Sequence, residues 1–166
     1  MIKDRPIWRK VKDYIFASFL FPLAFDVGVM FWGLFIFDRE TVATKDWDAI
    51  FPVWLNHFVH TDIMLFAVIE MIVLHRHYPK MKWSLIGILS LMISYVCWVH
   101  IINLVTDRWV YPILGQLNWI EIIAFDLFNI SVPIMFYFLG RLLNNLIWSN
   151  KRVQEILRNK HEQVEV

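Results

Sequence analysis

The sequence predicts an all-α protein, a polytopic transmembrane helix bundle with four spans in a single membrane domain, residues 1–166. Three observations predict it. Hydrophobic residues make up 58% of the 166 residues and charged residues only 19%, whereas a soluble domain is typically about 45–50% apolar and about 25% charged. Four apolar stretches reach the roughly 20 residues that a helix needs to cross the hydrocarbon core. Basic residues are concentrated in the segments that would then lie on one side of the membrane.

The four predicted spans cover residues 14–37, 50–74, 83–105 and 122–148. The first carries one charged residue, Asp26, the second is unusually polar, and the third has no Asp, Glu, Lys or Arg. The first span is longer than the roughly 7–15 residues of a signal-peptide core. We therefore expect it to be a signal-anchor span that stays in the protein.

The charges of the connecting segments predict the orientation of the bundle. The basic leader, 1–13, has five bases against two acids, the loop 75–82 has three bases and no acid, and the tail 149–166 has four bases against three acids. The segments 38–49 and 106–118, on the other side, are acidic or balanced. By the positive-inside rule, the leader, the tail and both termini are predicted to be cytosolic.

The composition also excludes several classes of function. One cysteine rules out an intrachain disulfide and a cysteine-based zinc cluster. A net charge of +1 gives no field to attract nucleic acid, so no nucleic-acid partner is expected. The chain has no nucleotide-binding glycine motif, no GxSxG and no HExxH. We expect no cofactor and no metal, and the expected partners are membrane lipids.

Polar residues inside the spans are the candidates for a functional site, because ionisable groups in hydrocarbon are costly and usually face the bundle interior. Asn56, His57 and His60 share one broad face of the second span, at helical spacings of three and four. A rise of about 1.5 Å per residue puts His60 about 3 Å from the midplane, with His57 and His100 about 7 and 9 Å outward. Asp26 is close to the midplane of the first span. The depths allow these five side chains to form one polar cluster.

Three kinds of role fit this cluster. Neutral imidazole is a general base near neutral pH and could activate a hydroxyl nucleophile. A polar network could instead only hold the helices together. His57, His60 and His100 could also bind a single zinc ion. The pairs His57-x-x-His60 and His75-x-His77 are similar to the histidine boxes of di-iron desaturases, which hold their metals with more histidines than the six of this chain.

Ordered motifs along residues 13–148 resemble the androgen-induced gene 1 family, also called FAR-17a-like proteins. The central motif is Pro52–Thr61, PVWLNHFVHT. The other motifs occur in the family's order and at its spacing: Phe31-Trp32, Phe37-Asp38-Arg39-Glu40, Ile69-Glu70, Tyr78-Pro79, Val96-Cys97-Trp98-Val99-His100, Trp109-Val110-Tyr111-Pro112 and Leu143-Asn144-Asn145-Leu146-Ile147-Trp148. The resemblance is specific, since no single short motif carries it.

The resemblance implies a multi-pass membrane protein whose relatives include hydrolases of fatty acid esters of hydroxy fatty acids. These use an intramembrane threonine nucleophile and a histidine, and the histidine of the family's Asn-His-x-x-His-Thr motif corresponds to His60. Asn56, His57, His100 and Asp26 would then support His60 by orienting its ring or by stabilising the oxyanion. The expected substrate is an ester dissolved in the bilayer.

The resemblance also implies that the chain is short at its N-terminus. The chain begins just before the segment that matches the family's third span, so two spans, including the one with the threonine nucleophile, are expected to be absent from it. Thr61 is adjacent to His60 but about 100° around the helix, which makes it a poor substitute. The alternative function is a non-catalytic membrane protein that binds lipid or a partner. The exposed edge of the bundle would allow an oligomer.

Overall fold

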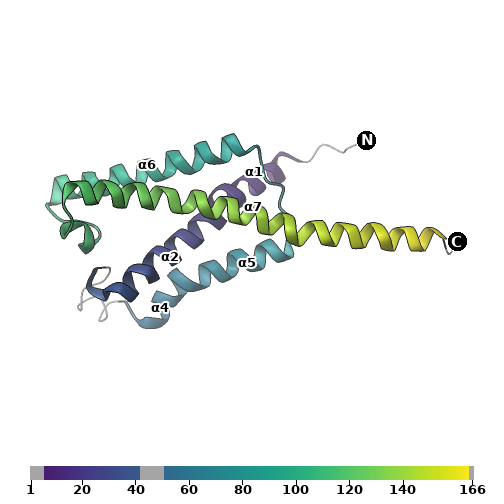
Figure 1. Cartoon of the computed structure of the whole chain (residues 1–166), viewed down its shortest axis with the longest axis horizontal. Helices are drawn as coiled ribbons and strands as arrows, with labels where there is room; N and C mark the ends of the chain where they lie inside the picture. Colours follow the sequence, from purple (N-terminus) through teal and green to yellow (C-terminus); the bar gives the residue numbers. More distant parts are fainter. Residues whose placement is uncertain (1–5, 42–50, 165–166) are drawn as a thin grey trace.

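The computed structural model describes residues 6–41 and 51–164, and these residues form helices joined by short segments (Figure 1). Four helices are long and apolar enough to cross a membrane: Ile7–Phe37, Val53–Val73, Met81–Thr106 and Trp119–Ser149. No strand occurs in the described ranges. The predicted all-α architecture with four spans is confirmed.

The first span begins earlier than the sequence predicts. α1 (Ile7–Ile15) continues through a π-helical turn (Phe16–Leu20) into α2 (Phe21–Phe37). The helix therefore starts at Ile7 instead of residue 14 and includes part of the basic leader. The reason is that the basic residues of the leader alternate with apolar residues at helical spacing, so this segment forms an amphipathic helix that a search for apolar stretches misses.

The second span has a similar construction. α4 (Val53–His57) starts directly after Pro52, and a second π-helical turn (Phe58–Asp62) leads into α5 (Ile63–Val73). Proline is tolerated where a helix begins because it lacks the N–H that a helix interior needs, which explains the start at Val53. The hydrophobic pattern does not reveal the π-helical turn. Such turns are rare and frequently lie at functional sites.

The third span, α6 (Met81–Thr106), ends where Asp107 adopts the left-handed conformation with φ 53°. The fourth helix is capped by Asn118. Its Oδ1 accepts hydrogen bonds from the backbone N–H groups two and three residues later, and Glu121 Oε2 accepts one from the N–H of Asn118. This reciprocal capping box fixes the start of the helix.

That helix, α7 (Trp119–Val164), has 46 residues and continues beyond the membrane-spanning part. The predicted tail, 149–166, is therefore helical as far as Val164. The hydrophobic signal ends near Trp148, but no Pro or Gly follows it, so nothing in the local sequence ends the helix there.

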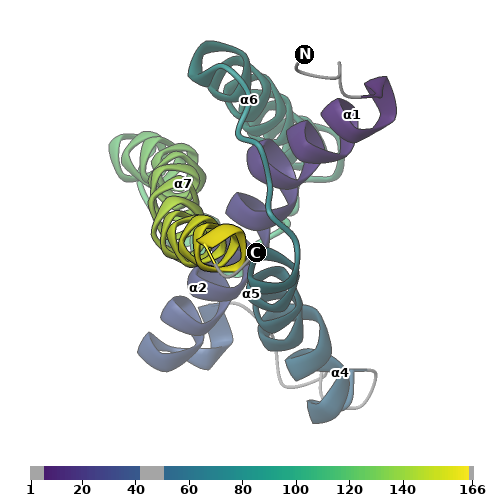
Figure 2. The same ribbon diagram turned by 90° about the vertical axis from the view of Figure 1, so that its right-hand side faces the viewer.

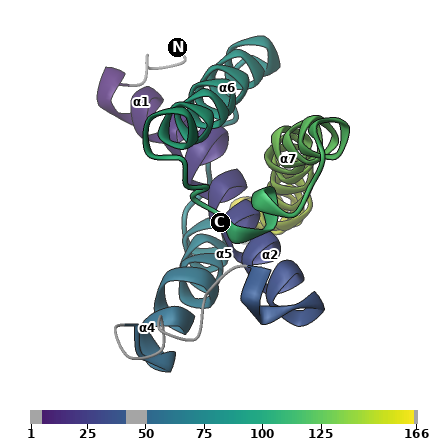
Figure 3. The same cartoon turned by 90° about the vertical axis from the view of Figure 1, so that its left-hand side faces the viewer.

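α2 packs against both α5 and α7, while α6 packs against α7 and the first π-helical turn. Figures 2 and 3 view the bundle from its two ends and show α5 and α6 on opposite sides of the first span. Buried apolar side chains lie where these helices meet, among them Phe16, Phe21 and Tyr137. Many other large apolar side chains are exposed on the outside, as expected for helices that face hydrocarbon.

The two ends of the bundle differ. The start of α1, the linker 74–80 and the C-terminal part of α7 lie at one end, which we call the terminal end (Figure 1). The segment 107–118, which joins α6 to α7, lies at the other end, which we call the distal end. That the terminal end faces the cytosol stays a prediction from the loop charges.

Candidate functional site

His60 is the candidate catalytic residue, and the structure determines how its ring is held. It lies in the π-helical turn, and its Nδ1 is 3.0 Å from the backbone oxygen of Asn56. A carbonyl oxygen only accepts hydrogen bonds, so Nδ1 carries the proton. Nε2 then keeps its lone pair and is the basic nitrogen of the ring.

The ring of His60 is also held from its face. Phe31 on α2 stacks on it, with 3.6 Å between ring centroids and 10° between ring planes. Gly28 allows α2 to come this close, because a Cβ atom at Gly28 would lie 2.6 Å from the backbone oxygen of His60 and 2.5 Å from Met64 Sδ. Glycine is needed at this helix contact, and the packing of α2 therefore sets the position of His60.

His60 lines a cavity of about 310 Å³ between α2, α6 and α7. Eight of the lining residues are apolar. Five lining residues carry polar groups: Asp26, His60, Tyr95, Tyr111 and Asn129. A mostly apolar cavity with a few polar groups is typical of a small-molecule site, and this lining suits the acyl chain of a lipid next to a polar linkage.

Asp26 brings a carboxyl group to the same cavity. It is only 6% exposed, and its Oδ1 is buried without a hydrogen-bond partner among the described residues. A buried polar atom without a partner is costly, so this oxygen is a candidate to bind a polar group of a ligand. The structure thus brings together Asp26 and His60, two members of the cluster considered from the sequence.

Two tyrosines that the sequence did not indicate add hydroxyl groups to the polar part of the cavity. Tyr95 on α6 and Tyr111 of the distal segment are hydrogen-bonded through their hydroxyl groups. Only one hydroxyl donates in this bond, so the other keeps a proton that it can donate to a ligand. The position of Tyr95 in a span without Asp, Glu, Lys or Arg is the signal that could have identified it.

His57 lies outside the cavity and has other partners. Its Nδ1 is 3.2 Å from Thr61 Oγ1, and its ring stacks on Trp32 with 5.0 Å between centroids. Trp32 Nε1 donates to the same Thr61 oxygen at 3.0 Å. Within the described part of the chain, no hydrogen bond joins Thr61 to His60. Asn56 supports His60 through its backbone oxygen, while its side-chain Oδ1 is buried with no hydrogen-bond partner in those residues.

His100 pairs with a residue that the sequence analysis did not assign to the site. Its Nε2 is 2.8 Å from Asp126 Oδ2 on α7, and Trp109 meets its ring edge to face. His100 does not line the cavity of His60. Counting residues places His100 at the level of His57, but α6 packs against α7, and this packing determines the partner of His100.

The arrangement of the described residues does not support the zinc or di-iron sites considered from the sequence. In residues 6–41 and 51–164, no three His, Cys, Asp or Glu side chains are grouped so that they could hold a metal ion. His57, His60 and His100 therefore do not form the zinc site considered above. His75 and His77 lie beside each other in the terminal linker, with 4.3 Å between ring centroids, and are not gathered with the histidines of the spans.

A comparison with known proteins identifies the family. The family described as FAR-17a/AIG1-like protein matches residues 2–145. The chain belongs to this family. It is 34% identical over 151 residues to the androgen-induced gene 1 protein of Homo sapiens, a match that covers 90% of this chain and 63% of that protein. It is 32% identical over 158 residues to the androgen-dependent TFPI-regulating protein of Mesocricetus auratus, covering 95% and 68%.

This FAR-17a/AIG1-like chain spans about two thirds of the length of the curated relatives it matches. No solved structure matches it. Family membership and the four apolar helices agree that it is a multi-pass membrane protein. The resemblance drawn from the motifs is confirmed.

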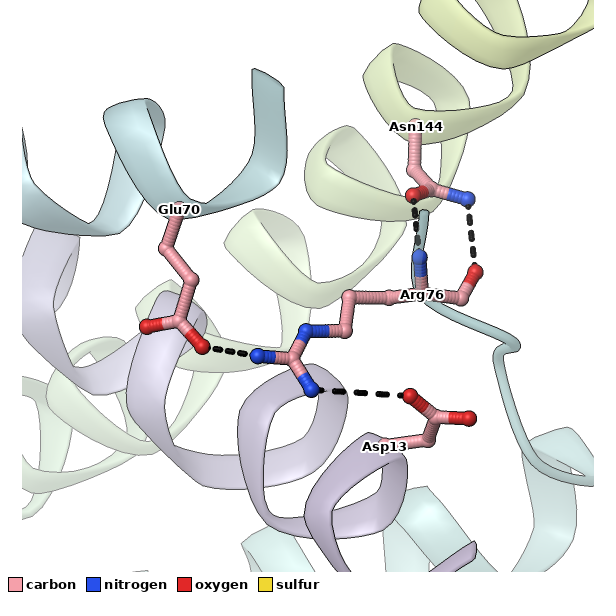
Figure 4. Close-up of polar contacts among 4 residues, drawn as sticks. All are labelled: Asp13, Glu70, Arg76 and Asn144. Atoms are coloured by element: carbon pink, nitrogen blue, oxygen red, sulfur yellow. Dashed lines mark hydrogen bonds and ion pairs between the residues drawn. The ribbon is translucent and has the colours of Figure 1, made fainter. Parts of the chain in front are cut away.

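A second polar cluster of this family member, at its terminal end, was missed from the sequence (Figure 4). Arg76 in the linker between α5 and α6 forms ion pairs with Glu70 of α5 and with Asp13 of α1, the latter with 3.6 Å between Nη1 and Oδ1. Asn144 on α7 accepts a hydrogen bond from the N–H of Arg76 and donates one to its backbone oxygen at 3.0 Å. One arginine thus connects the first, second and fourth spans, whereas the sequence analysis counted it only as a basic loop residue.

Proposed function

We propose that this chain supplies the general base and the acyl-chain cavity of a membrane-embedded lipid-ester hydrolase that cleaves fatty acid esters of hydroxy fatty acids. One observation carries the proposal. The basic nitrogen of His60, set by the hydrogen bond from Nδ1 to Asn56, belongs to a ring that lines a mostly apolar cavity between the spans. An ester dissolved in the bilayer would enter such a cavity with its acyl chain along the apolar wall.

The reaction follows from the state of His60. Nε2 takes the proton of a threonine hydroxyl while the oxygen of that hydroxyl attacks the ester carbonyl carbon. The tetrahedral intermediate then collapses, the bond to the hydroxy fatty acid breaks, and the departing oxygen takes the proton from Nε2. Water repeats both steps on the acyl-threonine and releases the fatty acid.

The nucleophile in this proposal is a threonine outside the described residues. Thr61 is the described threonine closest to His60 in sequence, but its hydroxyl is hydrogen-bonded to the side chains of His57 and Trp32. The hydroxyl proton of the Tyr95 and Tyr111 pair supports a role in stabilising the oxyanion, because a donor already in place costs no reorganisation during the reaction. Asp26 supplies an acceptor for the hydroxyl group of the departing hydroxy fatty acid.

The experiment compares two histidines of the same span. His60→Gln and His57→Gln are introduced into this chain, and the matching substitutions into the full-length human androgen-induced gene 1 protein, and ester hydrolysis is measured in membranes. We expect the change matched to His60 to lower the rate at least about 100-fold, the usual contribution of a general base. The change matched to His57, whose ring lies outside the cavity, should retain most of the activity. Equal losses from both substitutions would contradict the assignment of His60.

A second candidate function, lipid binding without catalysis, is favoured by the same stacking of His60 on Phe31 and by the absence of a hydroxyl bonded to His60 in the described residues. If the chain binds lipid without catalysis, His60→Gln should lower the melting temperature. A fluorophosphonate probe should then label neither the parent chain nor the variant. Labelling of this chain that depends on His60 would reject it in favour of the hydrolase.

A further inference from the structure

A second cavity, of about 450 Å³, lies at the terminal end between α1 and the linker 74–80. It is separate from the cavity of His60 and shares no lining residue with it. Its lining contains three cationic side chains, two histidines, one carboxylate and two apolar side chains: Arg9, Lys12, Arg76, His75, His77, Asp13, Trp8 and Leu74. The mixture of cations and an interfacial tryptophan is unlike the apolar lining of the first cavity.

The basic side chains of this terminal cavity are not all neutralised. Arg76 is paired with Asp13 and Glu70. Arg9 and Lys12 form no ion pair with the described residues, and their cationic groups lie over the ring of Trp8, 5.2 and 5.0 Å from its centroid. The lining thus holds three cations but only one carboxylate, that of Asp13. The excess positive charge belongs to Arg9 and Lys12 on α1, and it favours an anionic ligand.

Arg76 gives an independent indication that this cavity suits a hydrogen-bond acceptor. Its side chain is only 10% exposed, and its Nε is buried with no hydrogen-bond partner in the described part of the chain. An unpartnered N–H on a buried guanidinium is costly. Oxygen atoms of a phosphate group are the acceptors that a guanidinium binds best, since the hydrogen bond is charge-assisted on both sides.

The position of the cavity indicates which phosphate reaches it. Trp8 is an amphipathic residue of the kind that sits at the membrane–water interface. Ile7, Val11 and Ile15 of α1 are exposed beside it, at positions where the helix would meet hydrocarbon. A basic cavity beside a span at this level is a setting in which anionic head groups can be bound while their acyl chains stay in the bilayer.

We propose that the terminal cavity binds the phosphate group of an anionic phospholipid. Arg9 and Lys12 neutralise its charge, and Arg76 donates a hydrogen bond through Nε. The acyl chains of the lipid lie against the apolar side of α1. This site is independent of ester hydrolysis and of His60.

The test measures whether the full chain associates with an anionic lipid in preference to a zwitterionic one. The protein is reconstituted in phosphatidylcholine vesicles, and electron paramagnetic resonance gives the association of spin-labelled phosphatidic acid relative to spin-labelled phosphatidylcholine. We expect a several-fold preference for phosphatidic acid. The double substitution Arg9→Gln/Lys12→Gln, at two exposed positions of α1, should reduce this preference to nearly none while the helical circular dichroism is unchanged.

The matched control is Lys80→Gln/Lys82→Gln, which removes the same charge at the same end of the bundle from residues that do not line the cavity. It should keep the preference. An equal loss in the control would assign the effect to general surface charge and overturn the proposal, as would an absence of preference in the parent protein. Displacement of phosphatidic acid by inorganic phosphate at constant ionic strength would assign the cavity to free phosphate and overturn the lipid assignment.

Discussion

His100 on α6 donates a hydrogen bond from Nε2 to Asp126 Oδ2 on α7, with 2.8 Å between the two atoms. The two side chains are 28% and 17% exposed, so the pair lies largely away from the surrounding medium. The pair joins the two helices near the distal end of the bundle, and neither residue lines the cavity of His60.

Removing one partner of this pair should destabilise the protein more than removing both. His100→Leu leaves the carboxylate of Asp126 without its donor, and we expect a loss of about 1–3 kcal/mol. The double substitution His100→Leu/Asp126→Leu should recover much of this loss, because no buried polar group is left alone. Thermal unfolding of the single and double variants in detergent measures both effects. Additive losses in the double variant would show that the two side chains do not interact.

Arg76→Gln should cost about 3 kcal/mol, because it removes the guanidinium that pairs with Asp13 and Glu70 in partly buried positions. The variant keeps the backbone groups that bond to Asn144. Unfolding in a mild denaturing detergent measures the loss. Lys80→Gln, at an exposed position of the same linker, is the control and should change stability by less than about 0.5 kcal/mol.

Gly28→Ala and Gly33→Ala form a matched pair on α2. A Cβ at Gly28 would meet the backbone oxygen of His60, which cannot move without shifting the helix, whereas a Cβ at Gly33 meets nothing within 4 Å. We expect Gly28→Ala to cost about 1–3 kcal/mol and to move His60 from its place against Phe31. Gly33→Ala should stabilise the helix by about 0.5–1 kcal/mol. Melting temperatures of the two variants give the comparison, and equal values would mean that α2 and the π-helical turn are not in close contact.

The hydroxyl of Tyr78, in the linker before α6, should make the protein sensitive to alkali. Burial, and secondly the neighbouring Tyr137, raise the pKa of Tyr78 above its ordinary value of 10.0. Because the folded state disfavours the phenolate, this group contributes stability that is present below about pH 10 and is lost as the pH rises above the unfolded-state pKa.

Tyr78→Phe should remove that alkaline loss. Near pH 7 the substitution should change the stability little, because the hydroxyl is buried without a hydrogen-bond partner in the described residues. Melting temperatures of the parent and the variant are compared between pH 8 and pH 12. Curves that stay parallel throughout this range would contradict the prediction.

The four spans could be predicted because their signals are local. Apolar length, the charges of the loops and the proline at residue 52 act within a few residues of the feature that they determine. The helical parts at Ile7 and beyond residue 149 were missed for a related reason, since polar amphipathic segments form helices without the apolar run that marks a span. The π-helical turn that holds His60 has no local signature in the hydrophobic pattern.

The candidate site could be predicted only in part. Depth along the membrane normal follows from counting residues and allows Asp26 and His60 to lie at similar levels, and both residues line one cavity. Depth does not determine which helices are neighbours or which face each one turns inward. His57 therefore bonds to Thr61 on its own helix, and His100 bonds to Asp126, although both histidines had suitable depths for the predicted cluster.

The length of α7 means that a small tilt of its membrane part moves its C-terminal end by a large distance. Its 46 residues extend over about 69 Å, more than twice the roughly 30 Å of the hydrocarbon core. Figure 1 shows it projecting beyond the other helices at the terminal end. If a ligand between the spans tilts the membrane part by about 10°, Val164 moves by about 8 Å, because it lies about 45 Å from the middle of the span. A small tilt inside the bilayer would therefore become a larger displacement of the helix end outside it.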